Sequence, residues 1–325
     1  MSFSPKVLIS VLNWNNWKAT ETCLEALRRQ TYGNAQIVTV DNASQYAPDD
    51  FSERFPEAHL LRLRVNKGYA GGHLAAVKWA TGKNFDLIWL LNNDTVPAPN
   101  ALAELVKAWQ QQPDALYGSV TLKADGTINY GGGTLVNNNR ILDNTYNPLA
   151  GLPYETVKNE LVRRPVGELN GASLLIPFHI IQQYGFIDTG YFLYCEETEY
   201  CHMLWKKNIP SFVIPESVVV HQGAVSFTFN RKLEYVRAYY RTRNQLLLDK
   251  KYGRITNKVI RKELADYTDI ADFFIRHYIN RWRGNTLRHT HEYYLRYFRI
   301  LATFHALIGI SGKYVAPEKF LCSAD

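Results

Sequence analysis

Cysteine is scarce in this sequence and follows no pattern. The 325 residues include four cysteines, Cys23, Cys195, Cys201 and Cys322. No two of them form a CxxC pair, so their spacing supports neither a disulfide framework nor a structural zinc site. We expect all four thiols to be reduced. Internal repeats and low-complexity tracts are likewise missing.

Long hydrophobic runs are also missing. The first apolar run, residues 7–12, is too short for a signal peptide and has the wrong flanks. The longest later run, residues 301–310, is interrupted by His305 and is shorter than the roughly 20 residues that cross a bilayer. We therefore expect a cytoplasmic protein.

The first 225 residues have no excess of positive charge, and the last hundred carry all of it. Residues 1–225 hold 18 Lys and Arg against 21 Asp and Glu, whereas residues 226–325 hold 19 against 9. The 46% hydrophobic content allows one α/β core of about 200 to 250 residues plus an appendage. We expect a core domain over residues 1–225 and a basic, aromatic-rich helical region over residues 226–325.

Short apolar runs alternate with helical patterns through the first domain. Runs of strand length occupy residues 6–12, 36–40, 60–65 and 85–91, and helical spacing occupies residues 18–30, 71–80 and 97–112. Continuous apolar strands that alternate with helices are typical of a mostly parallel sheet covered on both faces. We expect a doubly wound α/β fold.

Glycine and polar residues interrupt this pattern between residues 117 and 167, where we expect a hairpin and then a mobile loop. The elements expected next are strands at residues 173–176, 212–214 and 218–220 and a helix at residues 196–207. After residue 226 the pattern is helical and aromatic, with helices expected at about residues 235–248, 260–282 and 287–308. These last helices would form a C-terminal appendage.

Polar residues follow several of the apolar runs, at the point where each strand would end. They are Asn13, Asp41, Asn92, Asn93, Asp94 and His221. Ligands of open α/β sheets bind outside the carboxyl ends of the strands, which makes these residues a candidate site. A hard divalent cation shared with substrate phosphates needs only one or two protein ligands, and Asp94 with His221 would suffice. Singly, each residue also fits a turn, a helix cap or a hydrogen-bonded histidine.

An acidic cluster follows the aromatic segment at residues 191–194. It consists of Glu196, Glu197 and Glu199. Carboxylates this close repel one another, which can raise one pKa toward a value suited to proton abstraction. The alternative is a solvated first turn of a helix, where acidic residues interact favourably with the helix dipole.

Five segments occur in the order and at the separations of known motifs. They are Val11–Asn16, Val40–Ser44, Asn66–Gly72, Trp89–Val96 and Phe192–Glu199. Together they resemble the successive motifs of glycosyltransferase family 2, and in particular its bacterial rhamnosyltransferase-like branch. The resemblance covers residues 6–252, in which residues 239–244 are similar to a family segment that follows the catalytic domain.

The resemblance implies a GT-A fold, which is Rossmann-like, and an inverting transfer from a nucleoside-diphosphate sugar. Asn92–Asp94 would occupy the position of the family's DxD-type motif, with Asp94 and His221 holding Mg2+ or Mn2+. Glu197 would be the catalytic base, and Asp188 and Glu196 would lie near the acceptor. The donor-binding residues that the resemblance implies are Asn13, Asp41, Asn42, Lys67, Gly68, Asn92, Asn93, Asp94 and Gly171.

Three residues depart from the family's pattern. The family's base is commonly Asp, and the extra methylene of Glu197 moves its carboxylate by more than the roughly 1 Å that can matter for catalysis. Either the pocket is adjusted, or Glu196 or Glu199 takes the role. His73 stands where relatives often have Asn, and Asn92 where many have Asp.

The donor and acceptor follow from the resemblance alone. The branch favours dTDP-L-rhamnose, with UDP-galactose, UDP-galactofuranose or an N-acetylhexosamine donor next. The implied acceptor is a glycan, or a glycan linked to polyprenyl diphosphate, in bacterial surface polysaccharide assembly. A catalytically inactive family member that serves as a scaffold would carry the same motifs.

Arginines and aromatic residues alternate in the C-terminal region. The arginines are Arg276, Arg281, Arg283, Arg288, Arg296 and Arg299. This composition suits contact with an anionic membrane surface, which would make the protein peripheral at the inner face of the cell membrane. Packing against the catalytic domain and a homo-oligomer interface are equally compatible with it.

Two other classes of protein fit the sequence less well. Arginines interleaved with aromatic rings also suit single-stranded nucleic acid, but a nucleic-acid-binding protein would leave Asp94, His221 and the acidic cluster unexplained. A nicotinamide dehydrogenase is disfavoured because residues 68–72 do not form a GxGxxG motif after the first strand.

Overall fold

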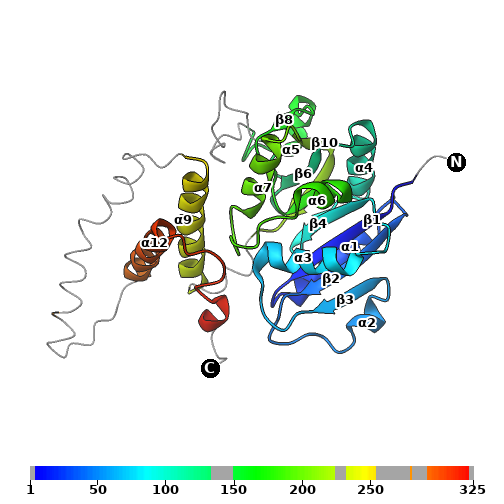
Figure 1. Ribbon diagram of the computed structural model, residues 1–325. Coiled ribbons are helices and arrows are strands. Elements are labelled where there is room, and N and C mark those ends of the chain that lie inside the picture. Colours follow the sequence, from blue (N-terminus) through cyan, green and yellow to red (C-terminus); the bar gives the residue numbers. More distant parts are fainter. Residues whose placement is uncertain (1–3, 133–148, 224–231, 254–278, 280–290, 322–325) are drawn as a thin grey trace. The chain divides into compact units, whose positions relative to one another are not determined.

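A computed structural model describes residues 4–132, 149–223, 232–253, 279 and 291–321 (Figure 1). The chain forms two compact units. The first contains Met1–Thr189 and Glu196–Ser226, and the second contains Gly190–Cys195 and Phe227–Asp325. Residues 190–195 therefore belong to the second unit although the chain on either side of them belongs to the first. Most of the loop expected after residue 137 and nearly all of the helix expected at residues 260–282 lie outside the described residues.

The first unit is built on one large sheet. Its strands run in the order β3-β2-β1-β4-β9-β6-β10-β5, with β7 beside β6 and β8 beside β10. Their bounds are β1 Val7–Asn13, β2 Ala35–Asp41, β3 Ala58–Arg62, β4 Leu87–Asn92, β5 Thr95–Pro97, β6 Leu116–Leu122, β7 Ile128–Tyr130, β8 Pro165–Val166, β9 Ser173–Pro177 and β10 Ser211–His221.

The sheet is mixed. Strands β3, β2, β1 and β4 are parallel to one another, and β6 is parallel to β10. Strand β9 lies antiparallel between these two groups, and β5 pairs antiparallel with β10. The predicted α/β fold is confirmed, but the central sheet is mixed and not mostly parallel, with its parallel pairs among β1 to β4 and between β6 and β10.

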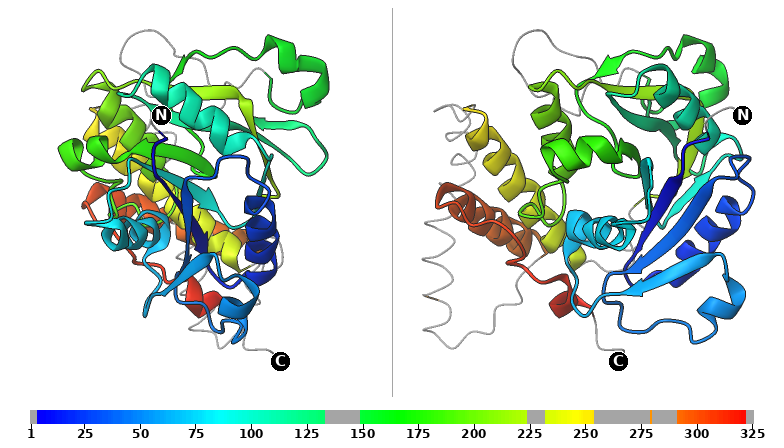
Figure 2. Two further views of the ribbon diagram at one scale, coloured as in Figure 1. Left: turned by 90° about the vertical axis from the view of Figure 1, so that its right-hand side faces the viewer. Right: turned by 45° about the vertical axis from the view of Figure 1, so that its right-hand side comes forward.

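Helices lie on both sides of the sheet, as Figure 2 shows. Their bounds are α1 Trp17–Leu27, α2 Phe51–Arg54, α3 Gly68–Ala80, α4 Ala101–Gln111, α5 Tyr154–Val157, α6 Phe178–Tyr184 and α7 Glu196–Trp205, with a short 3-10 helix at Lys158–Glu160. Successive residues of a strand point to opposite faces, so each buried strand needs apolar cover on both. Leu8 of β1 packs in the cluster that includes α3, α6 and α7, whereas Val7 and Ile9 pack with α1, α2 and α4.

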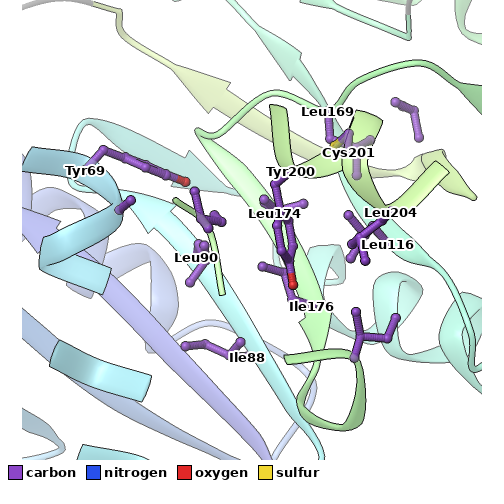
Figure 3. Close-up of a cluster of buried hydrophobic side chains, with 14 of the residues drawn as sticks. Tyr69, Ile88, Leu90, Leu116, Leu169, Leu174, Ile176, Tyr200, Cys201 and Leu204 are labelled. Atoms are coloured by element: carbon purple, nitrogen blue, oxygen red, sulfur yellow. The ribbon is translucent and has the colours of Figure 1, made fainter. Parts of the chain in front are cut away.

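One of these two hydrophobic clusters underlies α7. Figure 3 shows Tyr200 and Leu204 of α7 among side chains of the central strands, such as Leu90 and Leu174. Tyr200 and Leu204 have no exposed surface. The helix that begins with the acidic cluster is therefore fixed to the sheet by a buried apolar face.

Three expected elements differ in the structure. The helix predicted from residue 97 begins at Ala101, because Thr95–Pro97 forms β5 against β10. The two short strands predicted near residues 212–220 form one strand, β10, whose register shifts between Ile214 and Val218. Pro215 lies in this interval, and a proline cannot donate a ladder hydrogen bond. The described part of the chain also contains α6, which was not predicted.

The second unit contains α9 (Leu233–Lys251), α12 (His291–Leu307) and a short 3-10 helix, Pro317–Phe320. Helices α9 and α12 pack together through aromatic side chains. Tyr239 has no exposed surface, and its hydroxyl lies 2.6 Å from Nδ1 of His305. Two of the predicted C-terminal helices are thus confirmed in the described residues. In the part of the chain that the structure describes, no helix is long and apolar enough to cross a membrane.

A substitution at Gly118 of β6 would test how tightly the sheet is packed. A Cβ at this position would lie 2.9 Å from Leu169 Cδ2 and 3.3 Å from the Ser173 carbonyl oxygen. We expect Gly118→Ala to lower the free energy of unfolding by about 1–3 kcal/mol, the usual cost of overpacking, measured by urea unfolding. Gly33→Ala is the control, because a Cβ there meets no atom within 4 Å. Equal urea midpoints for the two variants would contradict this packing.

Candidate active site

Three neighbouring parallel strands end together at one edge of the sheet. Asn13 at the end of β1 is in register with Asp41 at the end of β2, and Leu12 is in register with Asn92 at the end of β4. Parallel pairing therefore brings the polar residues predicted from the strand ends to a single edge. This edge is where open α/β sheets bind ligands.

Asp41 is a buried carboxylate at this edge. It is 1% exposed, and its Oδ1 accepts a hydrogen bond of 3.0 Å from the backbone N–H of Ser44. Its Oδ2 lies 3.3 Å from Nε of Arg62, whose side chain is largely exposed. A carboxylate held in this way can accept hydrogen bonds from the hydroxyl or N–H groups of a ligand.

Asn42 shapes the start of α3. Its Nδ2 donates to Asn66 Oδ1 and to the Gly68 carbonyl oxygen, each at 3.0 Å, and its Oδ1 accepts from the Lys67 backbone N–H at 2.8 Å. Gly68 has a φ of 73°, a conformation that glycine adopts without strain. The amide of Asn42 is thus committed to the loop, while Lys67 lies exposed at the N-cap of α3.

The side-chain amide of Asn93 is likewise bonded to other residues of the chain. Its Nδ2 lies 3.0 Å from each of three acceptors, Asn13 Oδ1, the Asn16 carbonyl oxygen and Thr20 Oγ1. These contacts join the turn after β4 to the start of α1. The side chains of Asn13 and Asn93 therefore join the loops at this edge of the sheet.

Asp94 and His221 form the pair that a cation would require. Antiparallel pairing of β5 with β10 sets His221 opposite Thr95, the residue after Asp94. Nε2 of His221 lies 3.2 Å from Oδ1 of Asp94, and the two side chains are 15% and 12% exposed. The Gln222 N–H also donates to the Asp94 carbonyl oxygen at 3.0 Å.

This pair fits a divalent cation that is shared with a substrate. A carboxylate oxygen and an imidazole nitrogen both suit Mn2+, and a metal bound through phosphates needs few protein ligands. Nδ1 of His221 is buried without a hydrogen-bond partner, so its Nε2 is the nitrogen placed to act with Asp94. The described residues contain no group of three or more His, Cys, Asp or Glu that could hold a metal. Phosphate oxygens and water would have to complete the coordination.

Gly171 connects the acidic cluster to the strand ends. The backbone N–H of Gly171 donates to the Glu197 carboxylate, and the Tyr69 hydroxyl donates to the Gly171 carbonyl oxygen at 2.6 Å. A Cβ at Gly171 would lie 3.0 Å from Tyr69 Oη and 3.3 Å from Glu197 Oε1. The next residue, Ala172, accepts a 3.3 Å hydrogen bond from the Asn92 N–H. Glu197 is thus linked through one loop to the edge that carries Asp94.

Burial changes the acidity of the two adjacent glutamates. Glu196 is 3% exposed, and desolvation together with the negative charge of Glu197 raises its pKa well above its ordinary value. Desolvation also raises the pKa of Glu197, against the opposing effect of backbone N–H donors that include Gly171. The Oε2 atoms of both side chains are buried without a partner. The interpretation of this cluster as a solvated helical turn is therefore wrong for Glu196.

Three other residues named in the sequence analysis differ in their exposure. Asp188 is exposed in the loop after α6, whereas Glu199 is 2% exposed. His73 is fully buried, its Nδ1 lies 2.8 Å from Ser10 Oγ, and desolvation lowers its pKa to about 3. It stays neutral inside the core.

Sequence reasoning missed the residues that support the site. Ser44, Arg62, Asn66 and Tyr69 were not among the expected site residues, although all four contact expected donor-binding residues. Ser44, Asn66 and Tyr69 could have been found, because all three lie in the motif segments that resemble the family. Arg62 had no such signal.

Comparison with known proteins relates the first unit to one family. Residues 7–166 match the family model described as Glycosyl transferase family 2. This family match covers just under half of the chain. Along 94% of its length it is also similar, at 23% identity, to the low-salt glycan biosynthesis hexosyltransferase Agl10 of Haloferax volcanii, covering 92% of that protein.

Two solved structures share the fold of this glycosyltransferase domain. The mannosyltransferase PcManGT of Pyrobaculum calidifontis, in complex with GDP-Man and Mn2+, aligns with a TM-score of 0.54 at 14% identity over 94% of this chain and 88% of its own. GalNAc-T7 with UDP, GalNAc and Mn2+ aligns with a TM-score of 0.53 at 15% identity. That alignment covers 83% of this chain and 58% of GalNAc-T7. Both support the GT-A fold.

The buried Glu196 predicts a measurable dependence of stability on pH. Its pKa is raised in the folded state, whereas an unfolded glutamate titrates near about 4.3. Between these two pKa values the folded state binds more protons, so stability falls as the pH rises. We expect Glu196→Gln to be more stable than the wild type at pH 8 in urea unfolding, with the difference shrinking toward pH 4. Glu53→Gln, at an exposed position, controls for loss of one negative charge, and an equal response of the two variants would contradict the burial effect.

Proposed function

We propose that the protein is an inverting, metal-dependent glycosyltransferase in which Glu197 is the catalytic base. The observation that carries this proposal is the loop at Gly171, which holds the Glu197 carboxylate and is hydrogen-bonded to the end of β4 beside the Asp94–His221 pair. A base for the acceptor and a cation site for the donor's diphosphate then share one edge of the sheet. The family assignment of residues 7–166 supports the same class of reaction.

The donor would bind along the ends of the parallel strands. Asp41 is placed to accept hydrogen bonds from the ribose or base, and Lys67 lies exposed at the positive N-terminal end of α3. Asp94 and His221 would hold Mg2+ or Mn2+, and the cation would stabilise the negative charge on the departing diphosphate. Asn13, Asn42 and Asn93 would act by shaping the loops that these groups occupy.

The chemical step is a single displacement. Glu197 accepts the proton of an acceptor hydroxyl while that oxygen forms a bond to the anomeric carbon, and the bond from this carbon to the diphosphate oxygen breaks. Attack opposite the leaving group inverts the anomeric configuration. A raised pKa suits this role, because a base whose conjugate acid is weaker removes a hydroxyl proton more readily. Glu196, the buried neighbour, and Asp188, in the preceding loop, are the residues proposed to lie near the acceptor.

The donor class follows from the motifs and from one relative. The resemblance to the rhamnosyltransferase-like branch favours dTDP-L-rhamnose, and UDP-galactose, UDP-galactofuranose and UDP-N-acetylhexosamines are the alternatives. The similarity to a hexosyltransferase of glycan biosynthesis is compatible with all of these, because rhamnose is a deoxyhexose. It also supports a glycan acceptor.

The second unit is proposed to meet a lipid-linked acceptor at an anionic membrane surface. Residues 226–325 carry all of the chain's excess positive charge, and basic groups are attracted to anionic headgroups and to diphosphates. This assignment places the protein as a peripheral protein at the inner face of a bacterial cell membrane. Binding to vesicles with and without phosphatidylglycerol tests it independently of catalysis.

The role of Glu197 is tested by Glu197→Gln. The amide oxygen of Gln can still accept the Gly171 hydrogen bond, but the side chain cannot take up a proton. We expect sugar transfer to fall about 10²- to 10⁴-fold, the usual contribution of a general base, while donor binding is retained. Transfer is measured by release of the nucleoside diphosphate in the presence of acceptor. Nearly wild-type transfer would reassign the base, with Glu196→Gln and Glu199→Gln made in parallel to find it.

The cation pair is tested by Asp94→Ala in a thermal-shift screen. Wild-type protein is mixed with dTDP-rhamnose and with UDP-, GDP- and CMP-sugars, with and without Mn2+. A ligand present at 100 times its Kd stabilises the folded state by about 2.7 kcal/mol, so one nucleotide class should raise Tm in a Mn2+-dependent way. Asp94→Ala should lose the Mn2+-dependent shift.

The matched control for this screen is Asp114→Ala. Asp114 Oδ1 lies 2.9 Å from Nε2 of His179, so this variant removes an exposed Asp–His pair of the same kind elsewhere on the unit. It should keep the full shift. A shift that survives in Asp94→Ala, or no shift of the wild type with any donor, would contradict the proposed donor site.

A further inference from the structure

The backbone just before the acidic cluster is strained. Phe192, Tyr194 and Cys195 have φ values of 65°, 69° and 68°. Three of the four residues in the segment 192–195 therefore adopt the left-handed conformation. Side chains with a Cβ rarely adopt it, and none of the three is Asn, Asp or Gly. Such a segment persists only where its surroundings hold it in place.

Asn244 of α9 holds this segment directly. It has no exposed surface, and its Nδ2 lies 2.7 Å from the carbonyl oxygens of Tyr191 and Leu193 and 2.8 Å from that of Tyr194. One amide group thus faces three carbonyl oxygens in four residues. All three contacts lie within the second unit, to which residues 190–195 belong.

Arg243 holds the same segment and orients Asn244. Its Nη2 donates to the Tyr191 carbonyl oxygen at 2.9 Å, and its Nη1 donates to that of Gly312 at 2.7 Å. Its Nε donates to Asn244 Oδ1 at 2.9 Å. Because this contact needs an acceptor, it assigns oxygen to that side of the Asn244 amide and directs the NH2 group at the carbonyl oxygens.

Aromatic rings on the same face of α9 support the guanidinium. The Arg243 guanidinium carbon lies 5.4 Å from the Tyr239 ring centre and 4.8 Å from that of Tyr240, and the Tyr240 ring packs 4.9 Å from the Phe192 ring. Buried cations are stabilised by ring faces and by carbonyl acceptors. The arginine is therefore anchored where it meets the strained segment.

The segment leads straight into the proposed catalytic helix. Cys195 is joined by its peptide bond to Glu196, and Glu196 and Glu197 are the first two residues of α7. A change in the backbone at Cys195 acts through this bond on the first turn of α7, and a displacement of about 1 Å can cost a large part of a catalytic rate.

We propose that Arg243 and Asn244 are positioning residues that hold the strained segment 190–195 and thereby orient Glu196 and Glu197 for catalysis. This inference rests on the proposed function of Glu197. It assigns a role to the motif at residues 239–244, which lies outside the matched family domain. Neither residue is proposed to touch substrate.

The test is Asn244→Asp, which keeps the size of the side chain but replaces the NH2 donor with an oxygen that repels the three carbonyl groups. We expect kcat to fall at least tenfold, while KM for the donor changes less than about twofold, because the donor residues lie on other loops. A role confined to stability would lower Tm and leave kcat of the folded fraction unchanged.

The control is Tyr235→Phe, on the same helix. It removes the hydroxyl contact with Nδ1 of His291 but keeps Tyr239 and Tyr240 beside Arg243, so it should lower Tm and leave kcat near the wild-type value. Adding Cys195→Gly to Asn244→Asp should restore part of kcat, because glycine adopts a positive φ without strain. Arg243→Lys, which keeps the charge but loses the planar fork, replaces Asn244→Asp if that variant does not fold, and should lower kcat severalfold.

The outcomes separate the two proposals. If the wild type transfers sugar, Glu197→Gln is inactive and folded Asn244→Asp or Arg243→Lys has wild-type kcat, the positioning role is overturned and the proposed function stands. If the wild type transfers no sugar from any donor of the panel, the proposed function fails and the positioning role fails with it. Loss of kcat in Tyr235→Phe equal to that in Asn244→Asp would also overturn the positioning role.

Discussion

The parallel pairing of β1 with β2 and β4 is the constraint on which the site depends. It sets Asn13 beside Asp41 and Leu12 beside Asn92, so that the polar residue ending each strand reaches the same edge. Both faces of these strands are buried under helices, which fixes their register, since a slip of one residue would exchange the two apolar faces. The antiparallel strands complete the edge, because β5 and β10 join Asp94 to His221 and the loop before β9 carries Gly171.

Two glutamates buried at the start of α7 oppose stability and favour reactivity. Neither Oε2 atom has a partner, and desolvation raises the pKa of both carboxyls. The protein tolerates this because Tyr200 and Leu204 fix the helix to the core while the Gly171 N–H satisfies part of the Glu197 carboxylate. Gly171 leaves room for the Glu197 carboxylate to approach the loop, which is compatible with the proposal that a Glu takes the role of the family's usual Asp.

The sequence predicted what depends on local pattern. Continuous apolar runs located β1, β2 and β4 and therefore the residues at their ends, and helical spacing located α7. It could not predict pairing partners, because a short apolar run carries no information on direction. The strand at β9 was predicted but its antiparallel direction was not, and the short strand β5 was missed. The sequence also could not predict that the Asn93 amide faces the protein or that Asn244 binds residues 190–195. Both features depend on contacts between residues far apart in the chain.

The central claim is that this edge of the sheet holds a metal-bound nucleoside diphosphate. The most direct measurement is anomalous diffraction at the manganese edge from crystals grown with Mn2+ and the nucleoside diphosphate that best stabilises the protein. The account predicts one strong peak bound by Asp94 and His221, with the diphosphate on it and the nucleoside beside Asp41. A manganese peak on other residues, or a nucleotide ordered away from the ends of β1, β2 and β4, would contradict it.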